Sequence, residues 1–211
     1  MPTVDLPGLV AVVPLKAIPQ AKTRMAPQLS ADDRALLLHR TFARVAQALA
    51  ESVAVTDVLV VVGDEQGRRW AADLGLPTMA EPVPPAGLNA ALDAADLHLG
   101  ARPSLVIPAD LPLVTGLDLD LAASAATTTR CVVVAPTSDG GTGALIRLPG
   151  AVIPSPFGRN SAAAHVAEAG RLGVSCRRVH IAGLALDLDR PADIAEAGGW
   201  SVLTGGRSLA T

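Results

Sequence analysis

Short apolar runs that alternate with amphipathic, alanine-rich stretches constrain the fold of this 211-residue chain more than any other feature. The apolar runs are typical of buried strands; they cover residues 9–15, 57–64, 104–110, 130–136 and 143–148. The amphipathic stretches are typical of helices and cover residues 30–52, 66–75, 87–100, 160–170 and 191–198. This alternation predicts one α/β domain, residues 1–211, with three layers around a mostly parallel sheet. The tail from about residue 205 has few apolar residues and is expected to be loose.

The composition argues against several classes of function. A net charge of -3 gives no basic surface for nucleic acid, and two Trp and two Phe with no Tyr offer no stacking platform. No apolar run approaches the roughly 20 residues of a membrane span, and no signal peptide is evident. Cys131 and Cys176 are expected to be buried free thiols, which favours the cytoplasm. Whether the chain forms a homodimer stays open, with the run 57–64 either internal or near a dimer contact.

A carboxylate follows one of the expected strands. In "LVIPADLPLV", residues 105–114, four apolar positions lead to Asp110. Burying a charge is costly unless the charge is paired or bound to a metal. In open α/β sheets, ligands bind beyond the carboxyl ends of the strands, which is where Asp110 is expected. An Asp before Leu-Pro is also a good turn residue, and the two interpretations are equally supported.

Several familiar catalytic signatures are missing from the sequence. No G-x-G-x-x-G fingerprint and no Walker A loop are present. The four histidines show no close metal-ligand spacing, and no G-x-S-x-G elbow occurs. Covalent and dinucleotide chemistry therefore have little support.

Three cations share the loop after the first expected strand, residues 14–27: Lys16, Lys22 and Arg24. Three positive charges in one loop repel each other unless they face an anion, and a triphosphate is the obvious candidate. A solvated loop is the alternative. The position at the carboxyl end of a strand favours the anion site.

A second acidic pattern lies in "LALDLDRPADI", residues 184–194. Asp187 and Asp189 alternate with leucines, so on a strand both would face the same side. Together with Asp110 they could hold a hard cation such as Mg²⁺, which takes a few carboxylates plus phosphate oxygens and water. For Asp189, capping the helix that begins at Pro191 is an equal alternative.

The third pattern is "SPFGRNSAAAH", residues 155–165. Gly158, Asn160 and Ser161 precede an expected helix, whose free N–H groups and dipole favour an anion. Ordinary capping by Asn160 or Ser161 is compatible with that role. Upstream, the glycines of "SDGGTGAL" allow close backbone approach to a ligand, and Thr142 offers a hydroxyl.

Six motifs together resemble the phospholactate/phosphoenolpyruvate guanylyltransferase family, in the same order and from about residue 9 to 198. They are "VPLKAIPQAKTRMAP", "GLNAAL", "IPADLPL", "GGTGALIRLP", "FGRNSAAAH" and "LDLDRPAD". The resemblance implies a GT-A-like nucleotidyltransferase fold. It also implies GTP and a small phosphorylated three-carbon acid as substrates, and Mg²⁺ as cofactor. It also implies a role in the biosynthesis of coenzyme F420.

The resemblance further implies a role for each matching residue. Asp110 and Asp187 match metal positions; Thr142, Gly158 and Ser161 match positions that hold the phosphoacid. Lys16, Lys22 and Arg24 match the loop that meets the triphosphate, so Asp110, Lys22 and Arg24 are the expected catalytic residues. Asn89 falls where the family approaches the base or sugar. One departure is Gly143, where family members often have Asn.

Two rival functions stay open. A related nucleotidyltransferase could use CTP with a molybdopterin or a sugar phosphate, and a non-catalytic subunit could bind nucleotide without turnover. The acceptor is open among phosphoenolpyruvate, 2-phospho-L-lactate and 3-phosphoglycerate. The Ala- and Arg-rich, Lys-poor composition suggests a GC-rich bacterial genome and favours phosphoenolpyruvate.

Overall fold

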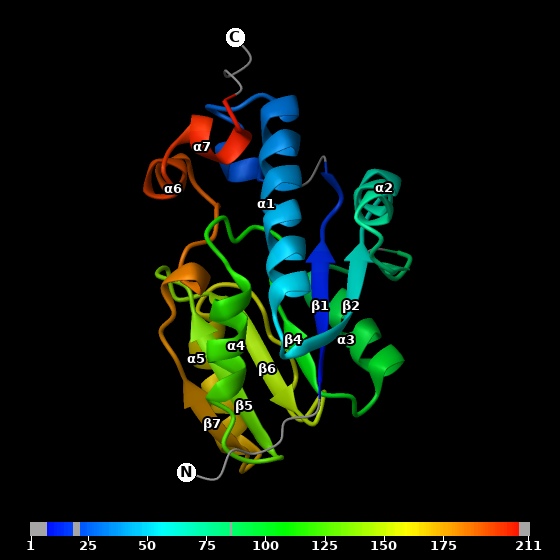
Figure 1. The fold of residues 1–211 in the computed structure, drawn as a ribbon. Helices are drawn as coiled ribbons and strands as arrows, with labels where there is room; N and C mark the ends of the chain where they lie inside the picture. Colours follow the sequence, from blue (N-terminus) through cyan, green and yellow to red (C-terminus); the bar gives the residue numbers. More distant parts are fainter. Residues whose placement is uncertain (1–7, 19–21, 85, 207–211) are drawn as a thin grey trace.

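A computed structural model describes residues 8–18, 22–84 and 86–206, and its central element is a mixed sheet (Figure 1). Seven strands lie in the order β3-β2-β1-β4-β6-β5-β7. Their bounds are β1 Leu9–Leu15, β2 Val55–Val62, β3 Thr78–Ala80, β4 Ser104–Val106, β5 Cys131–Pro136, β6 Thr142–Leu148 and β7 Ser175–Arg178. The expected strands are therefore present, and the mostly parallel sheet is confirmed.

One strand runs against the others. β6 is antiparallel to both β4 and β5, whereas every other pairing is parallel. Its register pairs Val106 with Leu145 and Ser104 with Arg147. The first residue of β6, Thr142, consequently lies at the edge where the parallel strands end. Reversing this one strand brings the glycine-rich turn before it to the carboxyl edge of the sheet.

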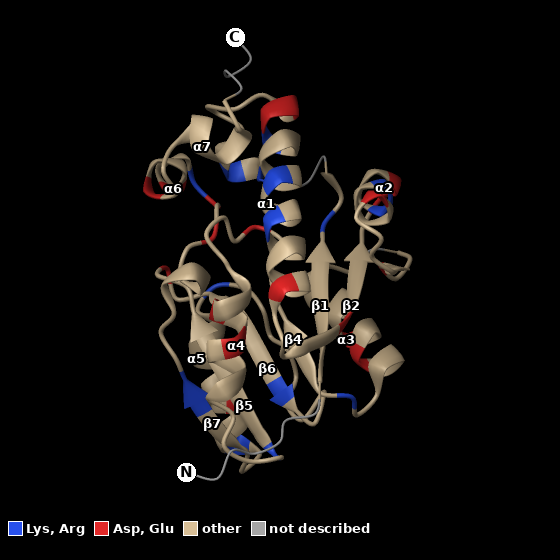
Figure 2. Ribbon diagram, in the orientation of Figure 1, with Lys and Arg blue, Asp and Glu red and all other residues tan. Residues whose placement is uncertain are grey.

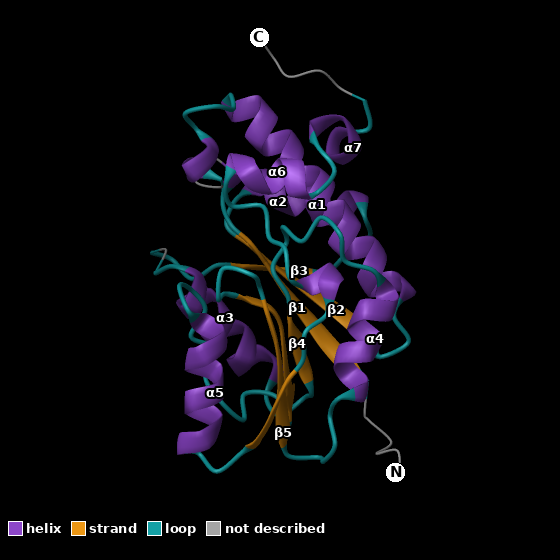
Figure 3. Ribbon diagram, turned by 90° about the vertical axis from the view of Figure 1, so that its left-hand side faces the viewer, coloured by secondary structure: helices purple, strands orange, loops and turns teal. Residues whose placement is uncertain are grey.

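Helices cover both faces of the sheet, which gives the predicted three layers (Figures 1 and 3). One face packs against α1 (Ala31–Glu51), α2 (Glu65–Asp73) and α4 (Gly116–Ser124) through a core that includes Phe42, Trp70 and Leu119. The other face packs against α3 (Leu88–Leu99) and α5 (Ser161–Arg171), with Leu92 and Ala169 in its core.

A third, smaller core lies beside the end of the sheet. There Met25, in the short 3-10 helix η2 (Thr23–Met25), packs with Leu37 of α1 and with Leu186 and Leu188. The short helices α6 (Pro191–Glu196) and α7 (Trp200–Thr204) close this cluster. The leucines of the "LDLD" motif are thus anchored in an apolar core, and the aspartates between them point away from it.

Helix caps explain one expected helix and one that the pattern conceals. Ser30 caps α1 and accepts a 3.1 Å hydrogen bond from the N–H of Asp33. Residues 117–120 read Leu-Asp-Leu-Asp, an alternation typical of a strand, yet they lie in α4. Thr115 and Asp118 form a reciprocal capping box at its start, and this local pairing outweighs the alternation.

Several expectations need correction. The run 104–110 is a strand only over Ser104–Val106, so Asp110 lies in the loop beyond it. Asp187 and Asp189 lie on no strand, although their flanking leucines are buried. For the run 57–64, the structure shows the internal alternative, because β2 pairs with both β1 and β3.

Three further features bear on the expectations from composition. Among the described residues Cys131 is buried and Cys176 half-buried, and both are free. No helix in the described part of the chain combines the length and apolarity needed to span a bilayer. The predicted loose tail lies largely outside the described residues, which end at Gly206.

Candidate active site

A cavity of about 760 Å³ opens at the carboxyl edge of the sheet. Segments far apart in the chain form it: the end of β1, η2, the loop after β4, the turn before β6, the start of α5 and residues 187–190. Figure 2 shows acidic and basic positions meeting in these loops above the sheet. The predicted site residues that line it are Lys16, Lys22, Arg24, Asp110, Thr142, Gly158, Ser161 and Asp187.

Lys22 and Asp110 form the central ion pair of this cavity. The Lys22 ammonium donates to the carboxylate of Asp110 and to the backbone carbonyl of Leu188. The lysine side chain is 3% exposed and the aspartate 22%. Lys22 adopts a left-handed backbone conformation with φ 55°, uncommon for a residue with a Cβ. The loop thus holds a buried cation against the carboxylate predicted to bind metal.

Asp187 joins the same carboxylate cluster. The N–H of Leu188 donates to the backbone carbonyl of Asp110 at 3.1 Å, which places the two predicted metal residues side by side. Burial, and then the negative charges of Asp110, Asp139 and Asp189, together raise the pKa of Asp187 to about 7. A site that crowds carboxylates in this way suits a divalent cation.

The described residues do not form a complete metal cage. Among them no group of three or more His, Cys, Asp or Glu side chains could hold an ion by itself. Mg²⁺ needs no such cage, because it is commonly bound through one or two carboxylates with substrate phosphates and water. Asp110 and Asp187 fit that kind of site, in which the nucleotide supplies the remaining ligands.

Arg24 and Asp189 form a second, more exposed pair, with Nη1 and Oδ2 2.7 Å apart. Asp189 does not cap α6. Instead Asp193 reaches back and accepts the N–H groups of Asp189 and Arg190, at 2.8 and 2.6 Å. The side chain of Asp189 therefore faces the cation loop. Two of the three loop cations are already matched by carboxylates, so the expected repulsion between them is partly relieved.

The third cation, Lys16, is exposed and makes no ion pair with the described residues. The backbone just after Lys16 packs closely against Gly63, the residue that follows β2. A Cβ on Gly63 would lie 2.5 Å from the backbone nitrogen of Ala17. Asp64 accepts the N–H of Ile18 at 2.6 Å and also caps α2 through the N–H of Gly67. Residues 19–21 of the predicted cation loop lie outside the described residues.

A hydroxyl pair lines the opposite wall. Thr142, the first residue of β6, lies 2.8 Å from the hydroxyl oxygen of Ser161, the first residue of α5. Behind them the Nδ1 atom of His165 lies 3.2 Å from the Thr142 oxygen. The structure thus brings together two predicted phosphoacid residues and a histidine that the sequence patterns did not assign.

The start of α5 has no side-chain cap. Asn160 is its N-cap residue, in a left-handed conformation with φ 56°, and its side chain makes no capping hydrogen bond. Neither Asn160 nor Ser161 acts as the side-chain cap that the sequence suggested. In the first turn, the N–H groups of Ser161 and Ala162 donate to the carbonyl oxygens of Gly158 and Gly140, at 3.1 and 3.4 Å. Gly158, which has φ 140°, and Ser161 both line the cavity, so the positive end of the α5 dipole lies at its wall and suits an anion.

The side chain of Asp139 stabilises the glycine-rich turn through two hydrogen bonds. The carboxylate of Asp139 accepts the Thr137 hydroxyl at 2.6 Å and the N–H of Gly141 at 2.9 Å. The Thr137 bond is the main reason that the pKa of Asp139 is lowered. At Gly143, a Cβ would lie 1.9 Å from the carbonyl oxygen of Leu184, so this backbone contact requires the departure from Asn noted above.

Asn89 lies outside the cavity lining. Its side chain donates to the carbonyl of Phe157 at 3.2 Å and accepts the N–H of the same residue at 3.0 Å. It therefore clamps the loop that leads to Gly158. A direct contact with base or sugar stays a prediction.

Three cavity residues were missed by the sequence patterns: Asp139, Arg159 and Arg190. Asp139 lies in the glycine-rich motif, and the sequence patterns assigned a role only to the glycines and Thr142 of that motif. Arg159 and Arg190 are exposed, and each is the only Lys or Arg in its motif. Only the fold places them at the same cavity as the loop cations.

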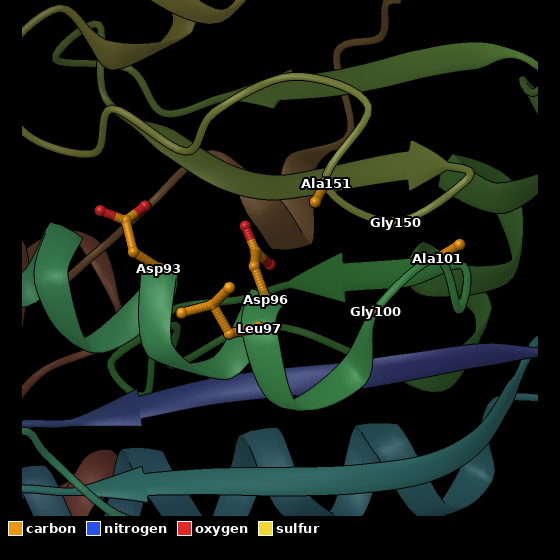
Figure 4. A pocket seen from close by; sticks show the side chains of 7 residues that line it. All are labelled: Asp93, Asp96, Leu97, Gly100, Ala101, Gly150 and Ala151. Carbon is orange, nitrogen blue, oxygen red and sulfur yellow. The ribbon is translucent and has the colours of Figure 1, made fainter.

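A second, shallower hollow of about 520 Å³ lies beside α3 (Figure 4). Asp96 faces the strand layer there and pairs with the buried Arg147, while Asp93 lies nearer the start of the helix. None of the predicted site residues lines this hollow; the lining residues are Asp93, Asp96, Leu97, Gly100, Ala101, Gly150 and Ala151.

Sequence comparisons show the family of this chain. The chain matches the family model described as "Guanylyl transferase CofC like" over residues 9–198. It is 36% identical to a phosphoenolpyruvate guanylyltransferase of Sphaerobacter thermophilus, covering 90% of this chain and 92% of the relative. A 3-phospho-D-glycerate guanylyltransferase of Phenylobacterium zucineum is 38% identical, covering 83% of each. A 2-phospho-L-lactate guanylyltransferase of Methanothermobacter thermautotrophicus is 34% identical, covering 88% and 82%.

Solved structures confirm the predicted nucleotidyltransferase fold. A nucleotidyl transferase from Methanothermobacter thermautotrophicus matches with a TM-score of 0.63 at 17% identity, covering 90% of this chain and 95% of that one. A 4-diphosphocytidyl-2C-methyl-D-erythritol synthase from Anaerococcus prevotii matches with a TM-score of 0.60 at 9% identity, covering 90% and 94%. With the fold shared and the family model matched over nearly the whole chain, the protein belongs to the CofC-like guanylyl transferase family.

Proposed function

We propose that this protein transfers the guanylyl group of GTP to a small phosphorylated acid and releases pyrophosphate. The observation that carries the proposal is that one cavity contains the Asp110 and Asp187 carboxylates, the loop cations and the start of α5. The names of the relatives, which are guanylyltransferases of three phosphoacids, support the same reaction.

The chemistry explains why no nucleophilic side chain is needed. A phosphate monoester has its second pKa near about 6, so at neutral pH its oxygen is largely ionised. That oxygen attacks the α-phosphorus of GTP and forms a new P–O bond. The bond between the α-phosphorus and the bridging oxygen breaks, and pyrophosphate leaves with the electron pair. The protein must then position two polyanions and stabilise the charge that develops.

The described residues divide this task. The positive end of the α5 dipole and the hydroxyls of Thr142 and Ser161 would orient the acceptor. Lys22 and Arg24 would turn from their carboxylates toward the triphosphate and stabilise the leaving pyrophosphate. Each cation would exchange a carboxylate partner for a phosphate and stay paired. The reorientation of the two side chains would therefore cost little electrostatic energy.

We also propose Mg²⁺ as the cofactor, held by Asp110 and Asp187. Bound there with nucleotide oxygens, it would neutralise phosphate charge. The raised pKa of Asp187 supports this assignment, because a bound cation would stabilise the charged carboxylate that burial and the neighbouring carboxylates disfavour. Asp189, paired with Arg24, is left to organise the cation loop.

Phosphoenolpyruvate is the proposed acceptor, supported by the composition and by relatives of that name, including the one from Sphaerobacter thermophilus. The product would enter coenzyme F420 biosynthesis, in the cytoplasm. A homodimer stays a prediction.

The test offers the purified protein GTP and Mg²⁺ with phosphoenolpyruvate, 2-phospho-L-lactate or 3-phospho-D-glycerate in turn, and measures pyrophosphate. Release with phosphoenolpyruvate is expected. Asp110→Asn should reduce turnover by about 10²-fold or more, as loss of a charge-stabilising group typically does. The exposed Asp73→Asn is the matched control and should retain full activity.

Other outcomes discriminate the rivals. Turnover only with CTP would favour a cytidylyltransferase. GTP binding without pyrophosphate release from any acceptor would favour a non-catalytic subunit. Full activity in Asp110→Asn would refute the assignment of this carboxylate.

A further inference from the structure

A fully buried histidine supports the hydroxyl pair of the acceptor wall. His165 is 0% exposed, on the second turn of α5, directly beneath Thr142 and Ser161. Its Nδ1 atom lies 3.2 Å from the Thr142 oxygen, which in turn lies 2.8 Å from the Ser161 oxygen. Among the described residues its Nε2 atom has no hydrogen-bond partner. The ring of Phe157 meets the imidazole edge-on, with centroids 5.0 Å apart.

The surroundings keep this imidazole neutral. Burial, and then the positive charge of Arg147, lower the pKa of His165 to about 4. A neutral imidazole carries one N–H, on either Nδ1 or Nε2. With the proton on Nε2, a buried donor would have no acceptor; with the proton on Nδ1, only a lone pair is left unmatched. The interior of a protein tolerates an acceptor without a hydrogen-bond partner more readily than an N–H donor without one.

We propose that His165 carries its proton on Nδ1 and thereby fixes the direction of the hydroxyl chain. The His165 N–H donates to the oxygen of Thr142, and the Thr142 hydroxyl donates to the oxygen of Ser161. The Ser161 hydroxyl is then free to donate into the cavity. His165 is a positioning residue, because it acts on a bound acid only through Thr142 and Ser161.

The opposite tautomer would reverse the site's polarity. If Nδ1 lacked a proton, Thr142 would donate to His165 and Ser161 to Thr142. Ser161 would then present only lone pairs to the cavity, and these repel an anion. One buried proton thus decides whether this wall attracts or repels a phosphoacid. The link to the acceptor rests on the proposed function, but the tautomer itself does not.

The first experiment reads the tautomer directly. The imidazole nitrogens of ¹⁵N-histidine-labelled protein are observed by NMR at pH 7, and the His165→Asn variant identifies the signals. The chain has four histidines, so assignment is tractable. A protonated Nδ1 with an unprotonated Nε2 is expected. A proton on Nε2, or on both nitrogens, overturns the proposal whatever the enzyme's substrate.

The second experiment uses two variants of the residue and measures KM and kcat for the proposed acceptor. Asn places an N–H donor near the position of Nδ1, so His165→Asn should keep KM within about threefold. His165→Leu has similar bulk and no donor, and should raise KM about tenfold, or about 1.4 kcal/mol. Its KM for GTP should stay unchanged.

A matched control separates positioning from general destabilisation. Val174→Ala removes buried volume from the same core and touches neither hydroxyl. It should leave KM unchanged even if it lowers the melting temperature. An unchanged KM in His165→Leu, or no rescue by Asn, overturns the proposal. Absence of guanylyl transfer in the wild type would instead refute the proposed function, and the NMR result would still decide the tautomer.

Discussion

Replacing Arg147 by methionine should destabilise the protein strongly, because this arginine is a fully buried cation with several partners. Its side chain is 0% exposed and that of Asp96 is 14% exposed. The two guanidinium nitrogens lie 2.7 and 2.5 Å from the two carboxylate oxygens. The arginine also donates to Ser104 and to the carbonyl of Ile153, each at 3.2 Å. Methionine keeps most of the stem and removes every donor.

The expected loss follows from what is left behind. Removing one partner of a buried ion pair typically costs about 3–5 kcal/mol, because the other charge stays desolvated. Asp96 retains some contact with water, so the lower part of that range applies, about 3 kcal/mol. For a chain of this size the melting temperature should fall by roughly 10 °C.

Urea unfolding of the wild type and two variants tests this expectation. Arg147→Met should lower the unfolding free energy by about 3 kcal/mol with an unchanged slope. The double variant Arg147→Met with Asp96→Leu should recover at least half of that loss, because no charge is then left unpaired. A loss below about 1 kcal/mol in the single variant, or a double variant that is no more stable, would refute the reasoning.

Three further predictions concern stability and the ion pair of the cavity. Because the pKa of His165 is about 4 in the folded protein and 6.5 is its ordinary value, stability should fall as the pH drops from about 6.5 to 4, by up to about 3 kcal/mol. His165→Asn should lose that part of the pH dependence in urea titrations, and an unaltered profile would contradict it. Gly143→Ala should cost about 1–3 kcal/mol, since its Cβ would overlap the Leu184 carbonyl, whereas Gly170→Ala, with open space, should be neutral or stabilising; equal effects on melting would show that the contact is unimportant. Lys22→Met removes the cation from its carboxylate partner, so Mn²⁺ binding without nucleotide, followed by electron paramagnetic resonance, should tighten about tenfold; weaker binding would show that the lysine does not compete with metal.

One local sequence pattern folds in two different ways in this chain. The Leu-Asp-Leu-Asp alternation occurs twice, at 117–120 in helix α4 and at 186–189 in a segment without regular secondary structure. Local periodicity is the same, so only the cap at Thr115 and the apolar cluster around Met25 distinguish the two. The edge strands β3 and β7 are short and largely exposed, and they carry no apolar alternation to reveal them. Sheet pairing alone makes them strands.

The sequence alone was enough to predict the α/β class, the main strands and helices, and several of the charged and hydroxyl residues that line the cavity. It could do so because burial imposes a local period, and because strand ends and helix starts bear local chemical signals. The tertiary structure decided which charges meet: Lys22 with Asp110, Arg24 with Asp189, and His165 beneath Thr142. These partners are separated by 88, 165 and 23 positions, so no local pattern links them. Only the reversal of β6 and the packing of "LDLD" beside the loop after β4 bring them within hydrogen-bonding distance.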